Sequence, residues 1–154
     1  MTSMPTPTTK LEPDACWALL RGTDVGRLAV VVGERPEIFP VNYAVDRGTV
    51  VFRTDPGTKL AGVVSAPAVA FEVDGYDEES DQAWSVVVKG SAEVVRGFIQ
   101  LLDTTDLPVF PWQATTKGQF VRVVADEVTG RRFRKADPSL WNTPLSGVRP
   151  QARQ

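Results

Sequence analysis

Residues 39–62 read FPVNYAVDRGTVVFRTDPGTKLAG, and this stretch predicts a strand, a tight turn, a second strand and the start of a helix. Two runs rich in β-branched and aromatic residues flank the turn at residues 46–48. The second run ends with a cation and a hydroxyl, Arg53 and Thr54. A second such pair, Thr58 and Lys59, follows the Pro-Gly break. Because a helix N-terminus offers free N–H groups and charge-assisted hydrogen bonds are strong, the stretch predicts a binding site for a phosphate monoester.

The composition is that of one globular domain with a hydrophobic core. The chain has 154 residues, 42% of them hydrophobic, and a formal net charge of -2. This charge argues against nucleic acid as a partner, because affinity for nucleic acid depends mostly on neutralising phosphates. No segment approaches the roughly 20 apolar residues of a membrane span, and residues 1–10 lack the apolar core of a signal peptide. We therefore expect a cytoplasmic protein with no nucleic-acid or membrane partner.

The absence of histidine excludes several kinds of catalytic and metal-binding site. A Ser-His-Asp or Cys-His triad within one chain is excluded, and so are histidine-ligated zinc and haem sites. The single cysteine, Cys16, lies on the apolar face of a predicted helix and is interpreted as a small buried hydrophobe. The acidic cluster at residues 74–81 lacks the spacing of an EF-hand loop. If the protein is an enzyme, a bound cofactor is expected to supply the chemistry.

Short strands and few helices predict an antiparallel β-barrel that is closed or nearly closed. Alternation of apolar and polar residues predicts six strands, at residues 26–32, 36–45, 49–54, 68–74, 83–95 and 119–128. Helices are predicted at residues 13–21, 59–65 and 98–102, loops at 75–81 and 107–116, and a turn at 129–130. Pro40 predicts an edge position or a bulge in its strand, and Gly90 a bulge or bend. The domain is then residues 11–135, between a disordered segment at 1–10 and a tail at 136–154.

Several segments together resemble a known family. They are residues 26–46, 50–59, 84–94 and 123–133, with the motifs PEIFPVNY, VVFRT-x-x-GTKL, AFEVDGYD and WSVVVKG. As a set they resemble the pyridoxamine 5'-phosphate oxidase-like FMN-binding split barrels. The resemblance implies an all-β fold with minor helices, built as a six-stranded antiparallel split β-barrel. It also implies a homodimer with two FMN sites in the clefts between the subunits.

The same resemblance implies which residues bind the flavin. The phosphate is assigned to Arg53, Thr54, Thr58 and Lys59, and the ring to the second strand at Pro40, Val41 and Asn42. Trp84 and Ser85 are expected at the flavin edge or ribityl chain, with Trp112 as an aromatic contact from the later loop. From the residues alone, Asn42 also fits a hydrogen-bonded position at the barrel rim. Trp84 and Trp112 also fit apolar packing in the core or at a subunit interface.

Three hypotheses for the function remain open. The first is an FMN-dependent oxidoreductase that exchanges hydride with a small substrate, with no catalytic residue assigned. The second keeps the fold but binds the deazaflavin F420, whose acidic tail the cations of residues 131–134 would line. The third is a non-catalytic flavin-binding module. Pyridoxamine phosphate itself is not expected as the substrate, because the chain has no convincing equivalent of the residues that grip its phosphate in true oxidases.

Overall fold

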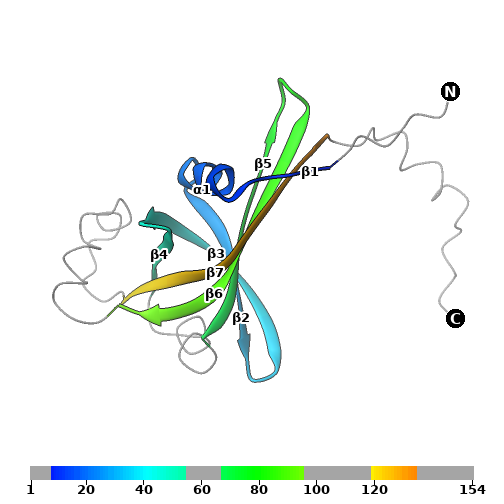
Figure 1. The fold of residues 1–154 in the computed structure, drawn as a ribbon. Coiled ribbons are helices and arrows are strands. Elements are labelled where there is room, and N and C mark those ends of the chain that lie inside the picture. Colours follow the sequence, from blue (N-terminus) through cyan, green and yellow to red (C-terminus); the bar gives the residue numbers. More distant parts are fainter. Residues whose placement is uncertain (1–7, 55–66, 96–118, 135–154) are drawn as a thin grey trace, which may run out of the picture.

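A computed structural model describes residues 8–54, 67–95 and 119–134. In these residues the β-strands form a closed barrel with one helix packed against it (Figure 1). The elements are β1 (Thr9–Lys10), α1 (Pro13–Arg21), β2 (Val25–Val32), β3 (Arg35–Asp46), β4 (Thr49–Thr54), β5 (Ala68–Asp77), β6 (Gln82–Val94) and β7 (Gln119–Arg134). The predicted helices at 59–65 and 98–102, the loop at 107–116 and the tail at 136–154 lie outside the described residues.

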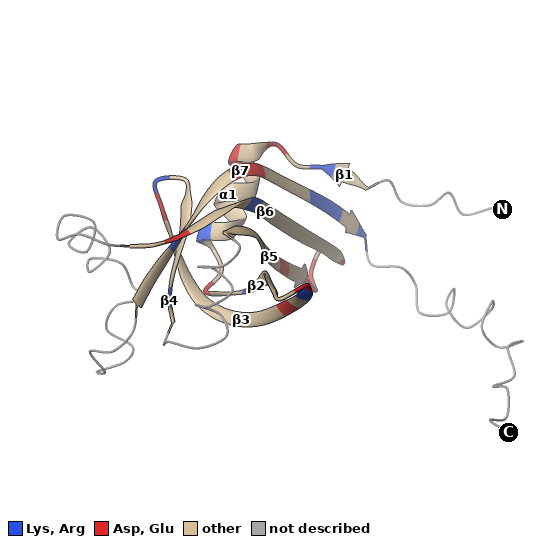
Figure 2. Cartoon of the chain, turned by 90° about the horizontal axis from the view of Figure 1, so that it is seen from below, with Lys and Arg blue, Asp and Glu red and all other residues tan. Residues whose placement is uncertain are grey.

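The sheet closes on itself. Its strand order is β1-β7-β4-β3-β2-β5-β6, and a further pairing of β6 with β7 completes a ring of six strands. Every pairing is antiparallel, and Figure 2 looks into the ring. The predicted antiparallel split barrel is confirmed.

Among the described residues the sheet has seven strands, whereas six were predicted for the chain. The additional strand is β1, whose two residues pair with Arg131 and Arg132 of β7 outside the ring. Two residues are too few to produce a period-two pattern, so the sequence carries no signal for this strand. Thr9 and Lys10 belong to the segment that was expected to be disordered.

Two glycines that were interpreted as loop and turn residues lie inside strands. A side chain at Gly130 would meet the Cys16 sulfur at 2.6 Å, and one at Gly75 would meet the Trp84 indole at 2.5 Å. These glycines allow close packing, so β7 continues past the predicted turn to Arg134 and β5 continues to Asp77. The predicted ends of these two strands were therefore wrong.

Two irregularities were predicted correctly. The register between β6 and β7 shifts between Lys89 and Gly90, which is the expected bulge. Strand β3 pairs with β2 from Arg35 to Asn42, but its pairing with β4 begins only at Tyr43. Pro40 therefore lies where β3 pairs on one side only within the described residues, and its missing N–H breaks no ladder there.

The core fills the ring and continues under α1. The helix begins with Pro13 at its first turn and ends at Gly22, as its sequence predicts. Tyr43 inside the barrel donates a 2.6 Å hydrogen bond to the Leu20 carbonyl and meets Phe71 edge-on, with ring centroids 4.8 Å apart. Burial raises the pKa of Tyr43 to about 12, so its hydroxyl stays protonated and donates this bond throughout the physiological range.

Candidate functional site

One exposed face of the barrel carries the best-supported candidate site. Alternation along β2 turns Leu28 and Val30 into the core and Arg27 to the outside. The cross-strand partner of Arg27 on β3 is Pro40, and Asn42 pairs with Val25 next to them. We call this surface the outer face: Val25, Arg27, Ala29 and Val31 of β2 with Pro36, Ile38, Pro40 and Asn42 of β3.

The outer face is unusually apolar for an exposed surface. Ile38 is 67% exposed, Val25 51% and Val31 44%. Isolated apolar side chains are common on surfaces, whereas contiguous ones typically mark a binding or contact surface. These residues lie on neighbouring strands of one hairpin, so they form such a surface.

Arg53 lies at the edge of this face beside Asn42. Tyr43 of β3 pairs with Phe52 of β4, and both side chains are buried in the core. The pairing of β3 with β4 stops there, so Asn42 and Arg53 are the next residues on the two strands, and alternation turns their side chains to the other, outward side. The structure therefore places a guanidinium on β4 one strand away from the Asn42 amide and the apolar residues of the outer face.

Three other predicted site residues turn inward. Val41 and Thr54 are each 5% exposed, and alternation along each strand places their side chains on the same side as the core residues Tyr43 and Phe52. Trp84 packs over Gly75 and against the core cluster, as in the alternative interpretation of this residue. The assigned role of these three residues in cofactor binding stays a prediction.

The remaining predicted residues are separated from this face or lie beyond the description. Ser85 points outward from β6, but β5 and β2 lie between it and Asn42. Thr58, Lys59 and Trp112 lie outside the described residues. The structure thus places Pro40 and Asn42 on β3 and Arg53 on the adjacent β4, whereas Ser85 lies three strands away from β3.

The basic end of β7 is a second charged surface. Arg131 pairs with Ser85 of β6 on one side and with Lys10 of β1 on the other. Arg134 Nε lies 3.9 Å from a carboxylate oxygen of Asp81, and both side chains are more than half exposed. Such exposed pairs contribute little stability, so these cations remain accessible to an anionic ligand.

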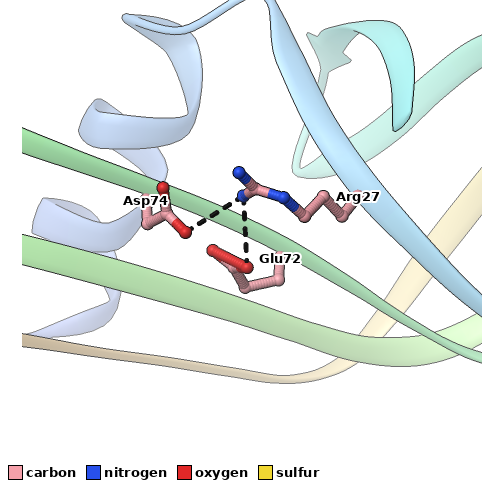
Figure 3. A network of polar contacts seen from close by, with 3 residues as sticks. All are labelled: Arg27, Glu72 and Asp74. Carbon is pink, nitrogen blue, oxygen red and sulfur yellow. Dashed lines mark hydrogen bonds and ion pairs between the residues drawn. The ribbon is translucent and has the colours of Figure 1, made fainter. Parts of the chain in front are cut away.

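An ion-pair network beside Pro40 was missed by the sequence analysis. Arg27 Nη1 lies 3.0 Å from Asp74 Oδ2 and 3.4 Å from Glu72 Oε2 (Figure 3). Burial raises the pKa of Glu72, the neighbouring Asp74 raises it further, and the Arg27 guanidinium opposes both effects. Alternation in AFEVD puts both carboxylates on one face of β5, but no local pattern shows that β5 pairs with β2.

Metal sites and membrane-spanning helices were also sought among the described residues. In the described part of the chain, no group of three or more histidine, cysteine, aspartate or glutamate side chains is arranged to hold a metal ion. None of the helices among these residues has the length and hydropathy needed to cross a bilayer.

A comparison with known families identifies the family of the chain. The family model described as pyridoxamine 5'-phosphate oxidase matches residues 12–132, most of the chain. This protein belongs to the pyridoxamine 5'-phosphate oxidase-like family. The match includes the outer face, the Arg27 network and the basic end of β7 as far as Arg132. The expected resemblance is therefore confirmed.

Three relatives of this pyridoxamine 5'-phosphate oxidase-like protein are informative. The FAD-binding protein of Mycobacterium smegmatis is 39% identical, with a TM-score of 0.69 over 82% of this chain and 98% of that one. A FAD-binding protein of Mesorhizobium loti is 26% identical, with a TM-score of 0.68 over 82% and 97% of the two chains. An uncharacterised protein of Mycobacterium tuberculosis is 33% identical over 129 residues, 80% of this chain and 84% of the relative.

Proposed function

We propose that this protein binds a flavin nucleotide on the outer face, with the phosphate at Arg53 and the ring against β3. The observation that carries the proposal is the placement of the half-buried Arg53 on the strand next to Asn42 and Pro40, which are exposed beside apolar side chains. The family match and the two FAD-binding relatives support it. The sequence assigns Thr54, Thr58 and Lys59 to the same phosphate.

The residues present suit the chemical parts of a flavin. Pro40 and Val25 offer apolar surface to an aromatic ring, and the Asn42 amide can both donate and accept at its polar edge. The Arg53 guanidinium matches a phosphate in charge and in the fork of its donors. A bound flavin supplies two-electron transfer to or from a small substrate, and the protein binds it, orients it and limits water access. We therefore propose an oxidoreductase.

The identity of the nucleotide is tested by titration. We expect the purified full-length protein to quench the fluorescence of FMN or FAD on binding and to carry a flavin absorbance band as isolated. FMN follows from the resemblance, and FAD is favoured by the names of the two relatives. Failure to bind either flavin would contradict the proposal. Tighter binding of F420 than of both flavins would favour the deazaflavin alternative, in which the cations around Arg131 line its tail.

Catalysis is tested separately from binding. With the flavin reduced, we expect its reoxidation by a quinone, a nitro compound or oxygen to be faster on the protein than free in solution. A bound flavin that exchanges electrons with none of these acceptors would support a non-catalytic binding module. A cytoplasmic location stays a prediction from the sequence.

We also propose that two copies pair through the outer face and enclose the flavin between them. The exposed Ile38, Val31 and Val25 support this, because burying them against a second copy removes apolar area from water. Ile38→Asp is expected to weaken self-association by at least about 30-fold, as for a central interface residue. Sedimentation of the variant is compared with Val124→Asp, a change to another exposed valine on β7. Unchanged self-association of Ile38→Asp would contradict this pairing.

A further inference from the structure

We propose that Arg27, with the two carboxylates that hold it, sets the preference of the site for oxidised over reduced flavin. The inference rests on the proposed function and assigns a role to residues that flavin binding alone does not require. In this role Arg27, Glu72 and Asp74 tune the bound flavin through their combined charge.

The placement of Arg27 is the first step. Arg27 pairs across the sheet with Pro40 on one side and with Glu72 on the other. All three therefore point to the same side of the barrel, and neighbouring strands lie about 4.8 Å apart. A ring resting on Pro40 and Asn42 thus has the Arg27 network as its neighbour on the next strand.

The second step concerns the contacts that fix the position of the Arg27 side chain. A single guanidinium nitrogen of Arg27 reaches both carboxylates, so the side chain extends from β2 towards β5 (Figure 3). The second oxygen of Glu72, Oε1, is buried and has no hydrogen-bond partner among the described residues. Two carboxylates and one guanidinium carry a formal net charge of -1, and Coulomb energies grow as burial lowers the local dielectric.

The sign of the effect follows from this charge. Reduction adds electron density to the ring, and charge near the ring changes the free energy of that step. A net negative network disfavours the reduced form. Removing one carboxylate should favour reduced flavin, whereas removing the guanidinium should disfavour it. Removing both restores the original net charge.

The experiment measures potentials and not turnover. Full-length wild type, Glu72→Gln, Arg27→Met and the double variant are loaded with FMN. Binding of oxidised FMN is followed by fluorescence, and the midpoint potential is measured by anaerobic titration with dithionite against a reference dye. Glu12→Gln serves as the control, since Glu12 is exposed at the N-cap of α1 and makes no side-chain cap.

We expect the midpoint potential of bound FMN to shift in opposite directions in the two single variants. Arg27 lies one strand from Pro40 and Glu72 two strands, and at these separations one unit of charge should change the ratio of affinities for reduced and oxidised FMN about tenfold. Tenfold corresponds to about 30 mV for a two-electron couple. The potential should rise in Glu72→Gln, fall in Arg27→Met and return close to the wild-type value in the double variant. A purely structural role predicts no such restoration.

The two proposals fail in different ways. If all variants bind oxidised FMN but the potentials stay unchanged or move in one direction, the role of Arg27 is overturned and flavin binding stands. If the wild type binds neither FMN nor FAD, both are overturned. An equal shift in Glu12→Gln would attribute the effect to overall charge and also overturn the inference.

Discussion

Replacing Phe71 with alanine is expected to lower the free energy of unfolding by about 3–5 kcal/mol, the usual cost of emptying a phenylalanine site in a core. Phe71 is fully buried. Its ring meets Tyr43 edge-on and fills the space over Gly26, where an added Cβ would lie 2.2 Å from it. Neighbours held by a closed ring of strands cannot collapse fully into the resulting cavity.

The position of Phe71 adds to this cost. Strands β2 and β5 are joined by only three residue pairs, Arg27–Glu72, Leu28–Phe71 and Ala29–Ala70. Phe71 is the middle residue of this short seam, and its side chain bridges β5, β3 and β2. Its loss should therefore weaken the closure of the barrel as well as its packing.

Urea unfolding followed by tryptophan fluorescence measures the effect. The matched control is Tyr76→Ala, which truncates an aromatic residue on the same strand that is 45% exposed. We expect that control to lose less than about 1 kcal/mol, as surface changes usually do. Similar losses for the two variants would show that Phe71 is not a central part of the core.

Replacing Arg53 with glutamine is expected to weaken flavin binding about 10- to 150-fold, the equivalent of one charge-assisted hydrogen bond. Glutamine keeps length and some polarity but removes both the positive charge and the fork that binds two phosphate oxygens. The sequence predicts a loss of the same kind for Lys59→Gln. Because phosphate binding is electrostatic, the wild-type affinity should also fall as salt is raised.

The measurement is the dissociation constant for FMN and FAD by fluorescence quenching. Arg35→Gln is the control, since Arg35 is an exposed cation at the far end of β3. That variant should bind flavin within about threefold of the wild type, because an exposed charge more than a Debye length away is largely screened. Wild-type affinity in Arg53→Gln would place the phosphate elsewhere and contradict the proposed orientation.

Much of the fold could be predicted from the sequence because the patterns that predict it involve residues close together in the chain. The helix at 13–21, the turn at 46–48 and the bulge at Gly90 each depend on residues close together in the chain. The hairpin from β3 to β4 also determines the register, which runs from Asp46–Thr49 to Tyr43–Phe52. A tight turn and a period of two leave few alternatives for such neighbours.

The errors in the predicted strand ends arose at glycines, because glycine can serve two different structural purposes. Gly75 and Gly130 were interpreted as loop and turn residues, but they admit the Trp84 indole and the Cys16 sulfur. A glycine that permits a turn and one that permits close packing look identical in sequence. Only the packing partners, which come from distant segments, distinguish the two.

Local alternation in the chain thus specified most of the strands and their inward and outward faces. The packed barrel decided which distant strands meet. It alone set β2 against β5, 45 residues apart, and so joined Arg27 to Glu72 beside Pro40. The reason is that non-local pairing depends on how the whole core closes, and no short stretch of residues carries that information.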